Sequence, residues 1–297
     1  MSDRFIPQLT ADGSATFYSD EFGETFHSHF GARQEAELKF VAPTKLDKQA
    51  LAPQIRLLDV CYGLGYNTAA ALAKIWAINP RCRVEIVALE ANANVPQSAS
   101  DRDLLSAWGE PTKQILTQLA TNHQVQTDIA RATLLIGDAR ATIKLIKPTW
   151  KAEAIFLDPF SPPNCPQLWT VEFIQLVANC LSSDGILATY SSAAAVRTAL
   201  IEAGLHISST VALGRRSPGT IAANYPLSQL SVLEQERLLT RAAIPYRDPS
   251  LNDLASVILQ RRRDEQQTSQ LETTSHWRKR IQFTKTLTFP QITDDSK

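Results

Sequence analysis

Four apolar segments of this chain each end at or beside a carboxylate, and this repetition restricts the fold more than any other feature of the sequence. Short apolar runs with few polar interruptions are typical of parallel strands that are buried on both faces. The carboxyl ends of such strands meet at one edge of an open α/β sheet, where ligands bind. The segments and their acids are Ile55–Val60 with Asp59, Val84–Leu89 with Glu90, Thr133–Ile136 with Asp138, and Ala154–Leu157 with Asp158. The sequence therefore predicts a mostly parallel α/β sheet with helices on both faces and four acids at its ligand-binding edge.

The last of these acids opens the motif Asp158-Pro159-Phe160-Ser161-Pro162-Pro163. The strand must end at Asp158, because prolines donate no ladder hydrogen bond and disfavour helical geometry in the residue before them. An acid, a proline and an aromatic residue in this order match the acid-Pro-Pro-aromatic pattern of enzymes that methylate nitrogen. Asp158 and Phe160 are therefore the predicted catalytic residues. The alternative is that Asp158 only caps the turn that follows it.

A glycine-rich turn follows the first strand and precedes an alanine-rich helix predicted at Ala69–Ile78. Its sequence is Cys61-Tyr62-Gly63-Leu64-Gly65-Tyr66-Asn67, in the strand–turn–helix context where glycines let the backbone approach a ligand. The spacing differs from the dinucleotide fingerprint, and the acid Asp59 favours S-adenosylmethionine (AdoMet) over NAD. Cys61 stands where the AdoMet pattern has its first glycine. The residues predicted to contact AdoMet here are Asp59, Gly63, Gly65 and Asn67; the alternative is a plain corner without a ligand.

The second and third acids extend the predicted cofactor site. Glu90 follows the glycines by about 25 residues, where a carboxylate can accept hydrogen bonds from both ribose hydroxyls. Asp138, beside Ala139, is placed to accept the exocyclic amine of adenine. Asp158 is also expected to lie next to the cofactor. Glu90 alone is also compatible with a helix cap, but four acids in series predict a cofactor site.

The first 45 residues predict a flap rather than part of the sheet. Phe5–Phe30 combines turn signals with short β-prone pieces, and a short helix is expected at Ala32–Phe40. Two histidines, His27 and His29, are spaced to point the same way from a strand. A metal site needs more ligands, and none lie nearby in the sequence, so we predict no metal. Tyr18 in this flap is expected to reach the cofactor.

The chain beyond the fourth strand predicts the rest of the α/β domain. Helical patterns cover Asp101–His123 (broken at Gly109-Glu110-Pro111), Trp169–Leu181 and a stretch that ends at Ala203, with Gly204 as its C-cap. A turn at Ser183-Asp184-Gly185 precedes a fifth strand, Ile186–Tyr190, whose Tyr190 is expected to close the substrate pocket. Two antiparallel strands, Ile207–Ala212 and Ile221–Ala223, flank a loop with Arg215 and Arg216. These arginines are predicted to bind phosphate; a solvated turn is the alternative.

Composition sets broad limits on location and partners. The 297 residues are 44% hydrophobic and 20% charged, which is ordinary for a globular protein, and the formal net charge is +0. No global basic field therefore indicates a nucleic-acid partner, although a local patch would suffice. Four cysteines without close pairing, and no apolar signal segment, predict the cytoplasm. No apolar run approaches the roughly 18 residues needed to span a membrane.

We expect residues 1–225 to form the main domain and residues 226–297 a C-terminal extension. Two amphipathic helices are predicted, at Leu230–Ala243 and Leu251–Arg263, followed by a loose polar segment at Gln266–Ser275 and a β-prone Leu287-Thr288-Phe289. The extension contains 11 Lys and Arg against 9 Asp and Glu, so it is only mildly basic. The sequence leaves open whether it forms a dimer, an RNA arm or a partner site.

These motifs together make the chain resemble the methyltransferase half of the MnmC family, bifunctional bacterial enzymes that make 5-methylaminomethyl-2-thiouridine in tRNA. The resemblance covers roughly Gly13 to Ala223. It is carried mainly by Phe17-Tyr18-Ser19 with Glu24-Thr25, Gly63-Leu64-Gly65-Tyr66-Asn67, Glu90, Asp158-Pro159-Phe160-Ser161-Pro162, Pro166-Gln167-Leu168-Trp169-Thr170 and Gly214-Arg215-Arg216. It implies a Rossmann-like class I AdoMet-dependent methyltransferase that acts on the aminomethyl group of wobble uridine 34. The implied partner is the tRNA anticodon stem-loop.

Two features depart from the family pattern. Cys61 replaces the first glycine of the loop, and no second dinucleotide-binding unit for an FAD-dependent oxidoreductase is recognisable. The chain is therefore expected to be a stand-alone methyltransferase whose amine substrate has another source. Two further functions fit the same sequence: an AdoMet enzyme for another RNA, a protein or a small amine, and a non-catalytic RNA-binding module with this fold.

Overall fold

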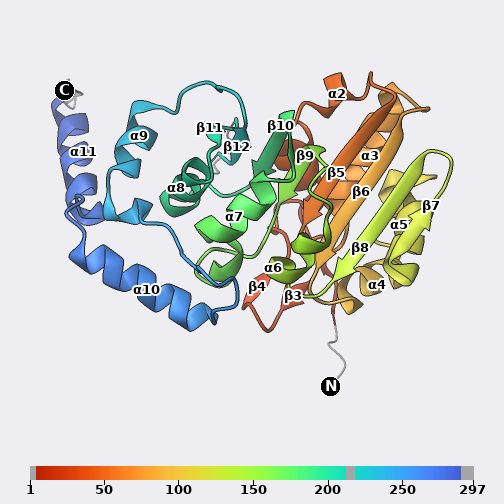
Figure 1. Cartoon of the computed structure of the whole chain (residues 1–297), viewed down its shortest axis with the longest axis horizontal. Helices are drawn as coiled ribbons and strands as arrows, with labels where there is room; N and C mark the ends of the chain where they lie inside the picture. The colour runs from red at the N-terminus through yellow and green to blue at the C-terminus, as the bar shows by residue number, and fades with distance from the viewer. Residues whose placement is uncertain (1–4, 212–217, 289–297) are drawn as a thin grey trace, which may run out of the picture.

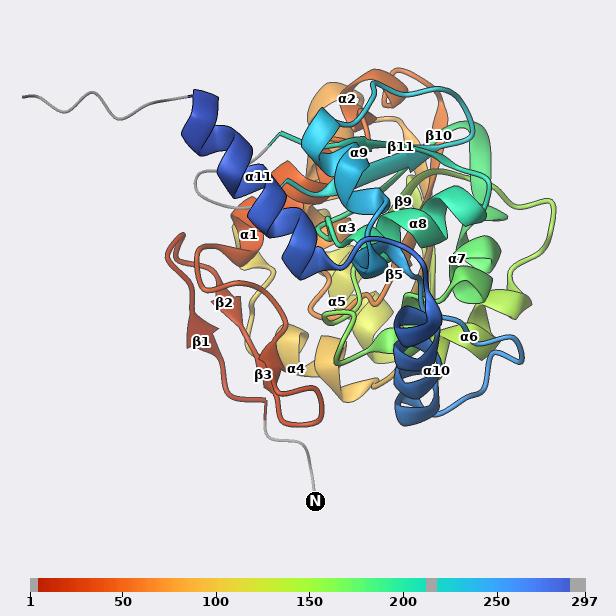
Figure 2. The same cartoon turned by 90° about the vertical axis from the view of Figure 1, so that its left-hand side faces the viewer.

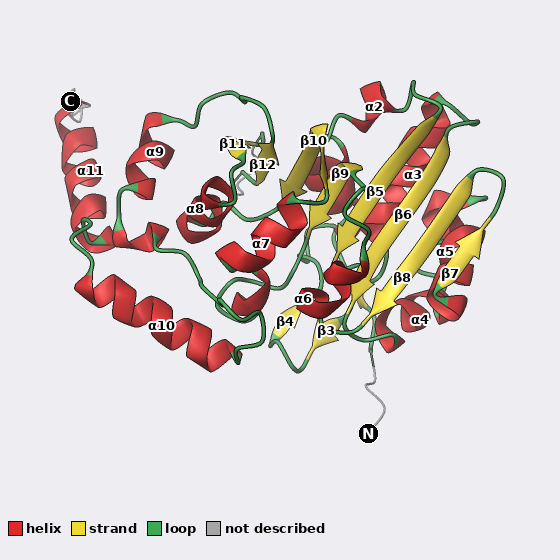
Figure 3. Ribbon diagram, viewed as in Figure 1, coloured by secondary structure: helices red, strands yellow, loops and turns green. Residues whose placement is uncertain are grey.

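A computed structural model describes residues 5–211 and 218–288, without the side chains of residues 283–288. Its centre is an eight-stranded sheet in the order β11-β12-β10-β9-β5-β6-β8-β7 (Figure 3). The strands β10, β9, β5, β6 and β8 are mutually parallel, whereas β7, β11 and β12 are antiparallel to their neighbours. The bounds are β5 Gln54–Val60, β6 Arg83–Glu90, β7 Gln124–Gln126, β8 Ala130–Ile136, β9 Ala152–Leu157, β10 Leu181–Thr189, β11 His206–Ser209 and β12 Thr220–Ala223. The predicted mostly parallel α/β fold is confirmed.

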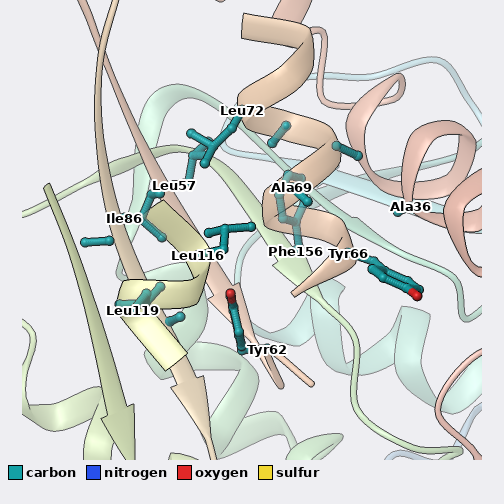
Figure 4. Packing of buried hydrophobic residues seen from close by; sticks show 14 of the residues in the cluster. Ala36, Leu57, Tyr62, Tyr66, Ala69, Leu72, Ile86, Leu116, Leu119 and Phe156 are labelled. Atoms are coloured by element: carbon teal, nitrogen blue, oxygen red, sulfur yellow. The ribbon is translucent and has the colours of Figure 1, made fainter. Parts of the chain in front are cut away.

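Successive residues of the central strands face two different hydrophobic cores, because side chains alternate along a strand. In β5, Leu57 belongs to one core and its neighbour Leu58 to the other. In β9, Phe156 likewise faces the first core, whereas Ile155 and Leu157 face the second. Figure 4 shows the first core, where side chains from the sheet pack against the helices α3 and α5. Burial on both faces explains the consecutive apolar residues in these strands, such as Leu57-Leu58 in β5 and Ala154–Leu157 in β9.

Helices cover both faces of the sheet (Figure 1). The first core is closed by α3 (Tyr66–Ile78) and α5 (Thr112–Asn122), and the second by α7 (Val171–Ala178) and α8 (Ala194–Glu202). Shorter pieces complete the layers: α4 Asn94–Asp101, a 3₁₀ turn at Ser106–Trp108, α6 Ala139–Thr142 and 3₁₀ turns at Ile143–Leu145 and Pro166–Leu168. The C-cap of α8 is Ala203, and Gly204, predicted as the C-cap, is the next residue, with φ +87°, the left-handed conformation that glycine favours just after a helix.

The N-terminal segment is the predicted flap, and it lies at the carboxyl ends of the parallel strands (Figure 1). It contains two small antiparallel pairs, β1 with β2 and β3 with β4, followed by a short α-helix and a π-helical segment. Their bounds are β1 Gln8–Leu9, β2 Ala15–Thr16, β3 Tyr18–Ser19, β4 Glu24–Thr25, α1 Ala32–Glu35 and the π segment Ala36–Val41. The next helix, α2 Leu46–Gln49, lies at the opposite end of the sheet (Figure 1). Within this flap the ring of Phe5 stacks on that of Phe17, and the ring of Phe26 meets both edge-on.

The C-terminal extension packs beside α8 at one end of the molecule (Figure 2). It contains α9 Val232–Leu238, a 3₁₀ turn Arg241–Ala243, α10 Ala255–Thr268 and α11 Thr274–Thr288. Tyr246 and Ile258 of the extension are buried in the second core, so the extension shares the hydrophobic core of the main domain. Tyr246 also forms a β-bridge with Thr170.

Three expectations for the later elements are wrong in detail. Ser183–Gly185 is not a free turn, because β10 already begins at Leu181 and absorbs these residues in a register irregularity between Leu181 and Ile186. The segment predicted to be loose is helical at both ends, since α10 continues to Thr268 and α11 begins at Thr274, whereas residues 269–273 form an irregular connection between the two helices. Leu287 and Thr288 lie in α11 rather than in a strand. Side-chain pairs from Glu272 to His276 and Arg280 support the start of that helix.

Within the described residues, no helix is both long enough and apolar enough to cross a membrane.

Candidate active site

A cavity of about 1210 Å³ lies between the flap and the carboxyl ends of the parallel strands. The flap contributes Tyr18, Phe22, Phe26, Glu35 and Lys39 to its wall. The sheet edge contributes most of the predicted site residues: Gly63, Asn67, Glu90, Asp138, Ala139, Asp158, Phe160 and Tyr190. Residues that lie far apart in the sequence are thus brought to one cavity, as the repeated strand-end acids predicted.

Glu90 organises the glycine-rich loop from the end of β6. Its Oε2 accepts a hydrogen bond from the backbone N–H of Gly63 at 2.8 Å, and its Oε1 accepts one from the backbone N–H of Asn92 at 2.9 Å. The residue is only 8% exposed, and burial raises the pKa of its carboxyl above the ordinary value. Glu90 therefore fixes the loop on one side and borders the cavity on the other.

Cys61 takes the place of a glycine in conformation as well as in sequence. Its φ of +68° lies in the left-handed region that side chains rarely adopt. The backbone N–H groups of Cys61 and Tyr62 both donate to the carbonyl oxygen of Leu89, at 3.0 and 2.9 Å, and hold the loop in this course. The Cys61 side chain lines the cavity and packs against the second core. Burial raises the pKa of its thiol well above the ordinary value, so the side chain is neutral.

Gly65 is required by both its backbone conformation and its surroundings. It caps α3 with φ +84°, and a Cβ at this position would lie 2.5 Å from the hydroxyl oxygen of Tyr62. Gly65 itself is not among the described residues that line the cavity. The structure therefore places it behind the loop, where it packs against Tyr62.

Gly65→Ala is expected to destabilise the protein by about 2–4 kcal/mol, because steric overlap with Tyr62 adds to the cost of a left-handed alanine. The matched control is Gly204→Ala, where φ is +87° but no atom lies within 4 Å of the new Cβ. This control should cost only about 1 kcal/mol. Urea unfolding of both variants measures the difference, and Tyr62→Phe should recover part of the loss in the Gly65→Ala background. Equal losses in the two glycine variants would contradict the packing argument.

Asp59 lies beneath the loop and is completely buried. Its Oδ2 accepts a hydrogen bond from the Thr68 hydroxyl at 2.6 Å, while its Oδ1 has no partner in the described part of the chain. Burial raises the pKa of Asp59 to about 7. Asp59 is also absent from the described residues that line the cavity. This position suits a residue that supports the loop and the first turn of α3.

Asp138 lines the cavity, but its carboxylate is hydrogen-bonded to Arg140. The guanidinium donates from Nε to both carboxylate oxygens (3.2 and 3.0 Å) and from Nη2 to Oδ2 (2.7 Å), and the Arg140 backbone N–H donates to Oδ1 (2.9 Å). Burial opposes ionisation, but these bonds outweigh it and lower the pKa of Asp138. Arg140 also pairs with the buried Asp248 of the C-terminal extension at 2.8 Å.

Asp158 follows the last residue of β9 and lines the cavity together with residues of the flap. The side-chain amide of Asn67 donates to its Oδ2 at 2.8 Å. Burial raises the pKa of the Asp158 carboxyl well above the ordinary value, and the negative charge of Glu35 raises it further. Glu35 forms an ion pair with Lys39 at 3.0 Å, and both side chains border the same cavity. The surroundings of Asp158 thus favour the protonated form of its carboxyl group more than water does.

Phe160 is enclosed by aromatic residues of the flap. Its ring stacks on Phe22 at 4.4 Å between centroids and meets Phe26 edge-on at 5.0 Å. Glu24 of β4 ties this flap to the motif, because it accepts hydrogen bonds from the Ser161 backbone N–H at 3.1 Å and the Asn164 amide at 2.7 Å. The Tyr190 hydroxyl donates to the Pro159 carbonyl oxygen at 2.9 Å. The motif and the flap therefore form one continuous wall.

The structure places the remaining predicted residues as follows. Tyr18 borders the cavity and is 43% exposed, so its ring lies at the mouth. Arg215 and Arg216 lie outside the described residues. Among the described residues, no group of three or more His, Cys or acidic side chains could hold a metal ion. The ring of His27 lies against that of Tyr66 and is partly buried, and desolvation lowers its pKa to about 4, so the ring is neutral.

Sequence reasoning assigned no role to three residues that shape the site: Phe22, Glu35 and Lys39. The spacing of Glu35 and Lys39, four residues apart on a predicted helix, was compatible with an ion pair. Nothing in their local sequence shows that this pair faces Asp158. That information comes only from the packing of the flap over the sheet.

Comparisons with known proteins give a consistent family. Residues 102–225 match a family model described as S-adenosyl-L-methionine-dependent methyltransferase. The crystal structure of MnmC2 from Aquifex aeolicus has a TM-score of 0.77 and 32% sequence identity, and the match covers 90% of this chain and 87% of that one. An uncharacterised protein of Methanocaldococcus jannaschii is 30% identical over 262 residues, which cover 86% of this chain and 70% of that protein.

A third relative is a longer protein. The tRNA 5-methylaminomethyl-2-thiouridine biosynthesis bifunctional protein MnmC from Acidovorax sp. is 31% identical over 205 residues, which are 65% of this chain and 31% of that protein. The match therefore spans about a third of the length of this bifunctional relative.

The cavity fits AdoMet, the cofactor of this family. The buried atoms Asn67 Oδ1 and Gln167 Oε1 have no hydrogen-bond partner among the described residues, and both residues line the cavity. Buried polar atoms without partners are costly, so such atoms around a cavity indicate a polar ligand. Glu90 and Gly63, both predicted to contact the cofactor, line the same cavity.

Proposed function

We propose that this chain, which belongs to the S-adenosyl-L-methionine-dependent methyltransferase family and is an MnmC-type methyltransferase domain, methylates the aminomethyl nitrogen of wobble uridine 34 in tRNA. The observation that carries the proposal is the position of Asp158 in a cavity walled by Phe22, Phe26 and Phe160. An acid beside an aromatic wall suits an amine attached to a planar base. The product would be 5-methylaminomethyl-2-thiouridine, the compound in the name of the Acidovorax relative.

Asp158 is the residue that prepares the nucleophile. AdoMet, when bound, supplies a methyl group on a positively charged sulfonium, which is electrophilic without further activation. An alkylamine is largely protonated at neutral pH and has no lone pair in that form, so the protein must align it and remove a proton. Asp158 accepts a hydrogen bond from the amine, while the Asn67 amide fixes the orientation of its carboxyl. The raised pKa of Asp158 makes it a stronger proton acceptor than an ordinary carboxylate.

The aromatic wall is suited to an RNA base that is unstacked and flipped out. Proteins that act on single-stranded RNA bases hold them by stacking on aromatic side chains. The wall of the cavity offers Phe160 for stacking, with Tyr18 at the mouth and Tyr190 beside the motif. An anticodon loop is single-stranded, so its wobble base can reach such a cavity. The loop with Arg215 and Arg216 is a candidate contact for the phosphates.

The test is methyl transfer from labelled AdoMet to bulk tRNA from cells that lack this gene, followed by nucleoside analysis. Labelled 5-methylaminomethyl-2-thiouridine is the expected product. Label in another nucleoside would show that this nucleoside, and not wobble uridine, is the substrate. Absence of label with AdoMet still bound would point to a protein or small-amine nucleophile, and absence of AdoMet binding would point to a non-catalytic module.

A further inference from the structure

The side chain of Gln167 borders the cavity without an assigned role. It lies in the 3₁₀ turn Pro166–Leu168 that follows the Asp158 motif. Its Oε1 is buried and has no hydrogen-bond partner among the residues that the structure describes. A buried amide oxygen without a partner is rare in folded proteins, and here it lines a ligand cavity. The simplest explanation is that a ligand supplies the missing donor.

Gln167 lies at the Asp138 end of the cavity. Cys165, two residues earlier, is close enough to Asp138 and Arg140 for their charges to affect its thiol. Leu168, the next residue, is buried in the same core cluster as Ala139. Both Gln167 and Ala139 line the cavity. This is the end at which the strand-end acids place the adenine of the cofactor.

Asp138 itself has little capacity left for adenine. A carboxylate has about four lone-pair positions. Arg140 supplies four hydrogen bonds to Asp138, two to each oxygen, three of them from its guanidinium. Arg140 is in turn held by Asp248 and by the backbone carbonyl oxygen of Asp253 in the C-terminal extension. The usual acceptor for the adenine amine is therefore occupied by a locked guanidinium.

We propose that Gln167 is the residue that recognises the adenine of AdoMet. An amide carries an acceptor and a donor side by side, which matches the amine donor and the N7 acceptor of adenine; glutamine reads adenine in DNA in the same way. The Oε1 atom then gains the donor it lacks. A base with a carbonyl at this position offers two acceptors and cannot pair with both amide groups. The proposal concerns the cofactor site alone and does not rest on tRNA as the substrate.

The experiment compares the binding of S-adenosylhomocysteine and S-inosylhomocysteine, which differ by the replacement of the adenine amine with a carbonyl. The natural chain should bind the adenine compound at least about fivefold more tightly in calorimetry, the lower range for such a pair. Gln167→Met, which keeps the length of the side chain, should reduce this preference to below about twofold. Gln175→Met is the matched control, because Gln175 is exposed on α7, outside the cavity lining, and its side-chain amide bonds to Asn179.

The variant Asp138→Asn tests whether Asp138, rather than Gln167, recognises the adenine. The proposal expects this variant to keep the preference for adenine, even if both compounds bind more weakly. Loss of the preference in Asp138→Asn, or its survival in Gln167→Met, would overturn the assignment. If Gln167→Met does not fold, as judged by circular dichroism, the Asp138→Asn result decides alone. A failure of tRNA methylation would leave both binding results intact.

Discussion

Asp158→Asn is expected to lower the turnover of methyl transfer by roughly 10²–10⁴-fold, the usual contribution of a positioned proton acceptor. The variant keeps a side-chain oxygen that can accept the hydrogen bond from Asn67, so the cavity should keep its shape. It loses the ability to take a proton from the amine. The affinity for AdoMet should therefore stay within a few-fold of that of the natural chain.

Single-turnover kinetics with saturating AdoMet, together with calorimetric binding of S-adenosylhomocysteine, measures both parts of this prediction. Asp184→Asn is the matched control, since Asp184 is an exposed acid on β10 that bonds to Ser182. It should leave turnover and binding unchanged. A loss of folding in Asp158→Asn, or turnover within about threefold of the natural chain, would remove Asp158 from the catalytic role.

Glu90→Ala is expected to weaken AdoMet binding by about 10²-fold or more. Two backbone hydrogen bonds to the carboxylate, from Gly63 and Asn92, hold the loop in place. Each bond to a charged group contributes about 1.5–3 kcal/mol. The expected ribose contact is lost as well. The effect should appear in affinity, and turnover at saturating AdoMet should fall much less.

Calorimetric titration with S-adenosylhomocysteine measures this loss directly. Glu85→Ala provides the matched control. Glu85 lies five residues earlier on the same strand, is only partly buried and does not line the cavity. Its affinity should be unchanged. An affinity within threefold of the natural value in Glu90→Ala would show that the cofactor does not depend on this acid.

The sheet could be predicted because the local sequence of each central strand is by itself typical of a buried strand. Burial on both faces forces an apolar run, and the proline after Asp158 ends β9 at a defined residue. The C-terminal helices were harder to place. Ser, Thr and Gln around residues 266–275 suggested a loose segment, yet α10 continues to Thr268. Its stability comes from distant contacts, such as Arg262 donating to the carbonyl oxygen of Ile244 and stacking over Tyr246.

The wall of the active site was predictable in part. The acids Glu90, Asp138 and Asp158 were expected at one edge, and all three line one cavity. The contact between Glu24 and Ser161 joins residues 137 positions apart and leaves no periodic signal. The same holds for the guanidinium of Arg140 on Asp138, which depends on Asp248 from the extension. Side-chain pairings across the fold are not encoded in local patterns.

The most direct test of the proposed reaction uses a synthetic anticodon stem-loop with 5-aminomethyl-2-thiouridine at position 34, labelled AdoMet and the purified chain. A matched stem-loop with 2-thiouridine at the same position differs only in lacking the aminomethyl group. We predict one methyl group transferred to the first RNA, none to the second, and none to either by Asp158→Asn. Equal labelling of both RNAs, or labelling of neither by a chain that binds AdoMet, would contradict the assignment of the aminomethyl nitrogen as the substrate.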